Sequence, residues 1–305
     1  MVEYRLLTYR DGNKPVAGIL VGDRVYPAAA LLRGTGIDAS SVKAMLGTWA
    51  KTHRALVKAA AKVKPANGKP LKRVKLLAPV LYPDGLFCAG ANYWDHMEEM
   101  ARAQGRTVDR STRPDGPWFF LKTSTHSIIG PDAPAKLPAR SHQVDWEAEL
   151  GVVIGKTAHD VPVERALDAV AAYTIINDLS ARDLMLRKDR PPVMAYDWIG
   201  QKCFDDASPM GPWVTPAAFL KDPSNLSIKL WVNGVLKQNS NTNQLIHNVA
   251  EQVSWLSYQL TLRPGDVIAT GTPAGVGMPR GEFLKKGDVV KIEIERCGTL
   301  TNRMA

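Results

Sequence analysis

The stretch VDWEAELGVVIG, residues 144–155, places Glu147 and Glu149 at the head of an apolar run typical of a β-strand. Side chains alternate between the two faces of a strand, so these two carboxylates share one face. Such a pair repels and is costly to bury unless a cation or hydrogen-bond donors lie between its members. A solvated strand end would need no partner, but the apolar run at 150–154 indicates burial. We therefore expect a divalent metal ion to neutralise the pair.

A third carboxylate, Asp178, ends another β-type run in YTIINDLSARDLM, residues 173–185. A helical pattern at residues 163–172 lies between the two runs, and a strand–helix–strand course can return the chain beside the first strand. Glu147, Glu149 and Asp178 would then converge. An all-oxygen ligand set suits a hard cation such as Mg²⁺, Mn²⁺ or Ca²⁺. The alternative is that Asp178 is only a turn or cap residue.

The composition indicates a globular protein with a large core. The chain has 305 residues, of which 45% are hydrophobic. No apolar run approaches the ~18 residues that a membrane span requires, and the first residues lack the apolar core of a signal peptide. The three cysteines, Cys88, Cys203 and Cys297, show no metal-ligand spacing. We therefore expect a cytoplasmic protein with no membrane partner, in which a catalytic role for Cys88 or Cys203 is a minor alternative.

The formal net charge is +9, and basic residues cluster between positions 51 and 75. This segment lacks interleaved aromatic residues and any nucleic-acid-binding motif. We interpret it as a solvated surface and expect no nucleic-acid partner. A positive field would instead attract small anionic substrates.

The order of turn signals and apolar runs predicts a mixed β fold (β-rich α+β) with a few short helices. Two or three strands are expected within residues 3–32 and a helix within 40–64. A linker is expected at 65–70. These elements suggest a small N-terminal α+β domain (1–75) before a catalytic domain (76–305). Further helices are expected at 93–104, 163–172 and 245–260. Long βαβ alternation is absent, which favours a barrel or roll over a doubly wound sheet. The predicted strands are residues 86–89, 118–121, 150–154, 174–176, 228–232, 267–269 and 289–294. Residues 105–117 form a polar loop that we expect to be mobile.

Four stretches in this order resemble the fumarylacetoacetate hydrolase family: LFCAGANYWDHMEEM, VDWEAELGVVIG, YTIINDLSARDLM and VIATGTPAGVG. The segments FFLKTSTHSIIG and WIGQKCFDDASPMGPWV strengthen the resemblance, which runs from about residue 77 to the C-terminus. The resemblance implies a mixed β-sandwich roll and a homodimer. It also implies Mg²⁺, Mn²⁺ or Ca²⁺ bound through Glu147, Glu149 and Asp178, in agreement with the strand alternation.

The resemblance also assigns residues around this metal site. It implies a lid helix that carries His96 and Glu99, a substrate-side lysine at Lys202 and a threonine at Thr272. His96 and Glu99, at positions i and i+3, are neighbours on a helix, so His96 is a candidate general base for a water, with Glu99 orienting its imidazole ring. Lys202 would stabilise negative charge on the substrate.

Three more residues are candidates for substrate binding, each with a structural alternative. Arg182 could bind a second substrate carboxylate or pair with Asp183 or Asp205. Lys122 could contact substrate or only close an edge of the core. Tyr93 could close over a ligand or pack in the lid.

The implied substrate is a small anionic oxo acid. The predicted activity is metal-dependent hydrolysis of a carbon–carbon bond in an acylpyruvate-type (2,4-dioxo acid) substrate, with a water activated by His96 and Glu99. The alternative is decarboxylation or isomerisation of a 2-oxo or 2-hydroxymuconate-type diacid in aromatic catabolism.

Overall fold

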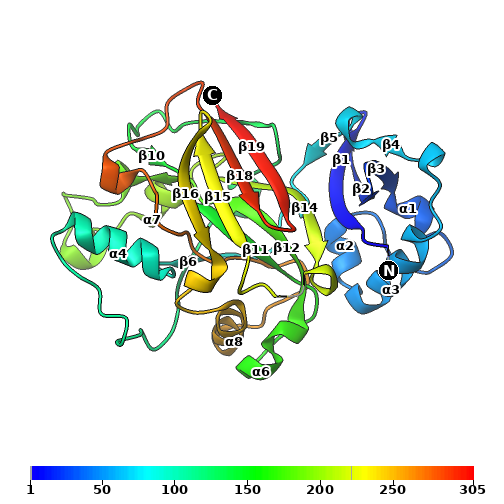
Figure 1. The fold of residues 1–305 in the computed structure, drawn as a ribbon, viewed down its shortest axis with the longest axis horizontal. Coiled ribbons are helices and arrows are strands. Elements are labelled where there is room, and N and C mark those ends of the chain that lie inside the picture. The colour runs from blue at the N-terminus through cyan, green and yellow to red at the C-terminus, as the bar shows by residue number, and fades with distance from the viewer. Residues whose placement is uncertain (1, 221) are drawn as a thin grey trace.

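The computed structural model describes residues 2–220 and 222–305. Over this part of the chain, the strands form a large twelve-stranded sheet, a five-stranded sheet and a two-stranded ribbon. Figure 1 shows the N-terminal strands and helices gathered at one end of the molecule and α4 at the other. The β-rich α+β fold predicted from the sequence is confirmed.

The large sheet runs through both the N-terminal segment and the rest of the chain. Its order is β4 (Lys69–Pro70), β3 (Arg24–Pro27), β2 (Lys14–Val21), β1 (Arg5–Asp11), β14 (Ser208–Pro216), β12 (Val170–Asn177), β11 (Ala148–Ile154), β17 (Val267–Ala269), β6 (Leu86–Gly90) and β7 (Trp118–Leu121). Off this path, β5 (Lys75–Leu77) pairs with β1, and β8 (Ile128–Ile129) pairs with β14. The sheet is therefore continuous from the N-terminal segment to the strands that carry the carboxylates.

The five-stranded sheet packs over β11 and β12 to complete a sandwich. Its order is β16 (Val235–Asn241), β15 (Ser227–Val232), β18 (Val289–Ile294), β19 (Gly298–Met304) and β9 (Pro134–Ala135). Leu150 and Val152 of β11 share a core with Ile228 and Ile292 of this sheet. Val153 points the other way, into a second core with the N-terminal segment. Because β11 is buried on both faces, its apolar run is nearly continuous.

The strand predictions are confirmed at all seven apolar runs. The helix predicted at 163–172 is too long, because α6 covers Val163–Ala166 and a short 3₁₀ turn follows at Leu167–Ala169. From Val170 the chain is strand β12, whose first residue pairs with Ile154. Ala171 and Ala172 are good helix formers, but here strand pairing and burial override that preference.

The other predicted helices are confirmed. The helix expected within 40–64 is two helices, α2 (Val42–Leu46) and α3 (Trp49–Ala60). Two single-turn helices, α1 (Ala28–Leu31) and α5 (Ser124–Ser127), were not predicted. The helix expected at 93–104 is α4 (Trp94–Ala103), and the one at 245–260 is α8 (Val249–Gln259), which a capping box of Asn248 and Glu251 starts. The predicted linker at 65–70 includes β4, which pairs with β3. A domain boundary near residue 75 stays a prediction.

Candidate metal centre and active site

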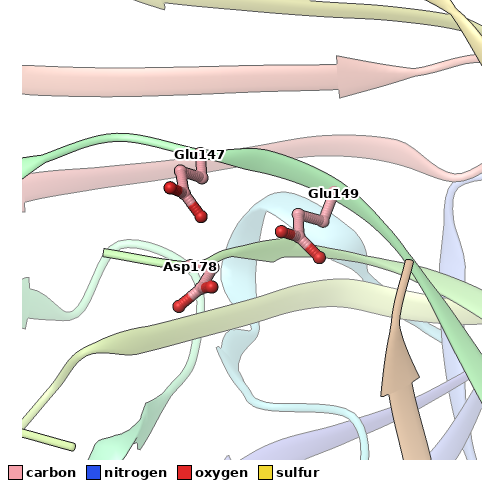
Figure 2. Close-up of side chains that lie close together, drawn as sticks. All are labelled: Glu147, Glu149 and Asp178. Carbon is pink, nitrogen blue, oxygen red and sulfur yellow. The ribbon is translucent and has the colours of Figure 1, made fainter. Parts of the chain in front are cut away.

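The three predicted carboxylates meet at one end of the β11–β12 pair. Glu149 lies on β11, Glu147 just before it and Asp178 just after β12. One oxygen from each of the three lies within 4.8 Å of the others, and all three side chains are buried. Figure 2 shows the two glutamates on one strand and the aspartate on its neighbour, with their carboxylates facing a common space.

Antiparallel pairing explains this convergence. Ala148 lies opposite Asn177, so the residue after β12 comes beside Glu147, and the Asp178 backbone N–H donates to the Glu147 carbonyl at 2.9 Å. The Asn177 side chain also accepts a hydrogen bond from the backbone N–H of Glu147. The predicted return of the chain beside the first strand is thus observed.

Two lysines hold Asp178. Lys202 Nζ donates to Asp178 at 2.7 Å and to Glu147 at 2.9 Å. Lys202 lies at the end of a short helix, α7 (Trp198–Lys202), which the Asp197 side chain caps. Lys122 Nζ lies behind the site, with hydrogen bonds to Asp178 and to the carbonyls of Leu179 and Ala207. All three Lys122 donors are used within the protein, which favours the structural alternative, in which Lys122 holds Asp178, over a contact with substrate.

Arg182 holds Glu147 from the other side. Its guanidinium donates to Glu147 at 2.5 Å and to Asp145 at 3.0 Å. Asp183, one of the partners expected for Arg182, instead accepts from the Ser141 hydroxyl. Asp145 also accepts from the backbone N–H groups of Gly277 and Met278. The sequence reasoning missed Asp145, although it stands two residues before Glu147 in the same motif.

Glu149 differs from the other carboxylates because it has no ion-pair partner among the described residues. Its one hydrogen bond comes from the backbone N–H of Gly271, at 2.8 Å. Burial, then the nearby carboxylates of Asp178 and Glu147, raise the pKa of Glu149 well above 4.5. Burial would raise the pKa of Glu147 too, but Lys202 and Arg182 hold it below the usual range.

This charge pattern fits a divalent cation. The cluster has four carboxylates (Asp145, Glu147, Glu149 and Asp178) and three basic groups (Lys122, Arg182 and Lys202), which leaves one negative charge uncompensated. That charge lies at Glu149, beside two other carboxylate oxygens. A buried all-oxygen donor set is the chemistry that Mg²⁺, Mn²⁺ and Ca²⁺ prefer. Glu147, Glu149 and Asp178 could therefore hold such an ion.

A cavity of about 320 Å³ opens onto this cluster. Six of the predicted site residues line it: His96, Glu147, Glu149, Arg182, Lys202 and Thr272. The Thr272 hydroxyl accepts a hydrogen bond from Gln238 at 2.9 Å, which leaves its own proton available to a ligand oxygen. An unpredicted wall of aromatic rings completes the cavity, with Trp118, Phe120, Tyr196 and Trp198.

The helix α4 brings His96 to the cavity, but Glu99 makes no hydrogen bond with it. His96 Nδ1 is buried without a hydrogen-bond partner in the described part of the chain. Burial lowers the pKa of His96 below 6.5, against the opposing effect of Glu147, so the ring is neutral at neutral pH. Glu99 instead accepts from the backbone N–H of Gly275 at 2.8 Å. The expected orientation of His96 by Glu99 is therefore corrected: Glu99 fastens α4 to the loop that carries Thr272.

Tyr93 lies at the start of α4 and is fully buried. Its hydroxyl has no hydrogen-bond partner within the described residues, and burial, then Glu149, raise its pKa. The structure thus places Tyr93 in the packing under the lid helix. Cys88 and Cys203 have pKa values raised by burial, which does not favour a thiolate nucleophile.

This β-rich architecture, with its buried cluster of carboxylates, is shared with known proteins. The model of the fumarylacetoacetate (FAA) hydrolase C-terminal domain matches residues 85–305, and the chain belongs to this family. It is similar to a mitochondrial oxaloacetate tautomerase of Xenopus laevis, with 42% identity over 231 residues that cover 75% of this chain and 68% of that protein.

Solved structures extend the similarity to the whole chain. Maleylpyruvate hydrolase from Sphingobium sp. SYK-6, in complex with manganese(II) and pyruvate, is 29% identical with a TM-score of 0.75, and the match covers 99% of this chain and 98% of that one. A 5-carboxymethyl-2-hydroxymuconate delta-isomerase from Mycobacterium smegmatis is 32% identical with a TM-score of 0.71, and the match covers 99% of both chains. The suspected family is therefore confirmed, and its members here include a hydrolase, an isomerase and a tautomerase.

The described residues contain no helix long and apolar enough to cross a membrane.

Proposed function

We propose that this chain is a metal-dependent hydrolase that cleaves a carbon–carbon bond in an acylpyruvate-type substrate. The single observation that carries the proposal is the buried Glu147–Glu149–Asp178 cluster with an uncompensated negative charge, open to a cavity that also contains a neutral histidine. The similarity to a maleylpyruvate hydrolase in complex with manganese(II) and pyruvate supports both the ion and the substrate class.

When bound by these three carboxylates, a divalent ion supplies a Lewis acid for the carboxylate and 2-oxo oxygens of an oxo acid. We assign the ion as Mg²⁺ or Mn²⁺. Lys202 orients Glu147 and Asp178 and adds positive charge at the wall of the cavity. The Thr272 hydroxyl donates a hydrogen bond to a substrate oxygen.

His96 acts as the general base in this proposal. Its lowered pKa keeps the imidazole neutral, and its unpartnered Nδ1 or the opposite nitrogen accepts a proton from a water molecule as the water oxygen bonds to the distal carbonyl carbon. The C3–C4 bond then breaks, its electron pair stays with C3 as the enolate of pyruvate, and the proton held by His96 returns to C3, which leaves pyruvate and the second acid. Glu99 acts as a positioning residue that fixes the helix carrying His96. Arg182 holds Glu147, and a direct contact of Arg182 with substrate requires one of its hydrogen bonds to be exchanged.

A second candidate is tautomerisation or isomerisation of a 2-oxo acid at the same centre. It is favoured because Glu99 and His96 make no hydrogen bond with each other within the described residues. Hydrolysis needs a water molecule activated by this pair, whereas tautomerisation does not. Oxaloacetate tautomerase and delta-isomerase relatives point the same way.

Product analysis separates the two. Purified protein with Mn²⁺ or Mg²⁺ is incubated with acylpyruvates and with enolic oxaloacetate, and products are followed by loss of enol absorbance and by mass spectrometry. Hydrolysis gives pyruvate and a second acid, whereas tautomerisation leaves the mass unchanged. Loss of enol absorbance without cleavage of any acylpyruvate would refute the hydrolase assignment.

The homodimer and the cytoplasmic location stay predictions. Light scattering at micromolar concentration tests the first: a mass near 67 kDa, twice the 33.4 kDa of one chain, is expected. Fractionation of cells that express the tagged full-length protein tests the second.

A further inference from the structure

The walls of the cavity combine charged and apolar groups. Arg182, Lys202 and Thr272 share them with aromatic rings and with Met100, Met185 and Met278. Lys202 Nζ lies 4.9 Å from the centroid of the Phe120 ring, and Trp198 packs edge-on against Trp118 and Phe120, with ring centroids 5.0 and 4.8 Å apart. The cavity therefore offers apolar surface and ring faces close to its charged groups.

Neither basic side chain that lines the cavity is free to bind a second carboxylate. Arg182 is bound to Asp145 and Glu147, and Lys202 is bound to Glu147 and Asp178. A distal carboxylate would have to break one of these buried ion pairs or remain unpaired, and both are costly.

A second cavity, of about 230 Å³, lies beside the first, and residues of the loop at 105–117 form part of its wall. The two cavities share Gly90, Ala91 and Trp118 as wall residues. The second one is otherwise mostly apolar, with Trp94, Met97, Val108, Pro114, Pro117 and Ile246. For scale, an apolar cavity of about 150 Å³ is enough to hold a benzene molecule.

The polar residues of the second cavity supply no cation to pair with an anion, and His247 offers only a neutral Nε2–H, which is buried without a hydrogen-bond partner within the described residues. Asp109 is acidic, and no lysine or arginine lines the cavity in the described part of the chain. His247 Nδ1 is 2.8 Å from the Arg113 guanidinium, so Nδ1 must be the acceptor and the ring carries its proton on Nε2. Burial and then Arg113 lower the pKa of His247, so the ring is neutral.

We propose that the substrate is an oxo acid whose distal group is uncharged, apolar and about the size of an aromatic ring, and that this group occupies the second cavity. This inference rests on the proposed function, because the oxo acid end must lie at the carboxylate cluster. The substrate class is therefore an aryl- or branched-alkyl-substituted acylpyruvate in preference to a dicarboxylate.

The test measures the binding of three 2-oxo acids that lack the 4-oxo group and so cannot be cleaved between C3 and C4. They are 2-oxopentanoate, 2-oxo-4-phenylbutanoate and 2-oxoadipate, titrated by calorimetry into Mn²⁺-loaded protein. The phenyl compound should bind at least about tenfold more tightly than 2-oxopentanoate, because it buries a ring. The dicarboxylate should bind no better than 2-oxopentanoate.

Variants at Val108, a half-buried loop residue outside the catalytic cluster, locate the effect. Val108→Trp should fill the second cavity and remove most of the advantage of the phenyl compound, because it weakens the binding of the phenyl compound much more than that of 2-oxopentanoate. Val108→Arg should improve the binding of 2-oxoadipate, and Val108→Ala is the control for loss of the native side chain.

The outcomes separate the two proposals. If none of the three acids binds, the proposed function fails and this inference fails with it. If 2-oxopentanoate binds but the phenyl compound gains nothing, or if 2-oxoadipate binds best, the proposed function stands and the apolar substrate class is overturned. The same follows if Val108→Trp leaves the phenyl advantage intact.

Discussion

Replacing Glu149 by glutamine should stabilise the protein without metal and abolish its stabilisation by metal. In the metal-free protein Glu149 is buried near Glu147 and Asp178 without a basic partner. At the 4.8 Å limit between ligand oxygens, two unit charges repel by about 3 kcal/mol at an effective dielectric constant of about 20. Glutamine keeps the shape and removes this repulsion.

Glu149 can avoid this repulsion by taking up a proton, and proton linkage then gives a cost of the same size and sets the pH window. The folded-state pKa of Glu149 is raised, so the folded protein keeps a proton that the unfolded chain releases above pH 4.5. For each pH unit above 4.5 over which Glu149 stays protonated, the folded protein loses about 1.4 kcal/mol of unfolding free energy. The loss at pH 7 is therefore at most about 3 kcal/mol. The advantage of Glu149→Gln should therefore be largest at neutral pH and vanish near pH 4.

The matched control is Glu147→Gln, which should have the opposite effect. Glu147 is paired with Lys202 and Arg182, so its removal leaves two buried cations short of a partner and costs about 3 kcal/mol. Its pKa is lowered, so the contribution of Glu147 is present above pH 4.5 and is lost as the pH falls.

Urea unfolding with a chelator, followed by circular dichroism at pH 7 and pH 4, measures both effects. Addition of Mn²⁺ at 100 times its Kd should then raise the unfolding free energy of the wild type by about 2.7 kcal/mol and leave Glu149→Gln unchanged. A Glu149→Gln protein that is less stable than the wild type at pH 7 without metal would refute the charge assignment. A wild-type response of this variant to Mn²⁺ would refute the ligand assignment.

Three further predictions concern the catalytic groups. His96→Gln should lower the rate of C–C cleavage by a factor of about 10²–10⁴ and spare keto–enol exchange measured by deuterium uptake; equal cleavage rates would remove His96 as the base. Burial lowers the pKa of His96, so kcat/KM of the wild type should decline on the acidic side with an apparent pKa below 6.5. The residual activity of His96→Gln should lack this decline. An apparent pKa at or above 6.5 would contradict a buried neutral base. Lys202→Met should lower the unfolding free energy without metal by about 3 kcal/mol, because Glu147 and Asp178 lose their shared donor. It should also lower turnover at least 100-fold. Unchanged stability in urea would show that the lysine is not paired in solution.

The convergence of the three carboxylates was largely predictable because it follows from short-range rules. Alternation puts Glu147 and Glu149 on one face, and a short connection brings Asp178 beside them. The partners of these carboxylates were less predictable, since Lys122, Lys202 and Arg182 approach from three different segments. Two further contacts give no signal in the sequence: Asp145 binds Arg182, and Glu99 binds the loop around Gly275.

Strand β14 shows where sequence patterns mislead. It contains Pro209, Pro212 and Pro216, which argue against a central strand because proline donates no hydrogen bond, yet β14 lies between β1 and β12. Its register with β12 shifts between Tyr173 and Ile175, which accommodates the missing donors. The long helix predicted over 163–172 is wrong for a related reason: tertiary pairing decides the state of residues whose local preference is helical.

The most direct measurement of the central claim is the anomalous scattering of manganese in a crystal grown with Mn²⁺. The account predicts one strong peak per chain, in contact with oxygens of Glu147, Glu149 and Asp178, and no such peak in the Glu149→Gln protein. A wild-type crystal with manganese bound elsewhere, or with these three carboxylates paired only to lysine and arginine, would contradict it.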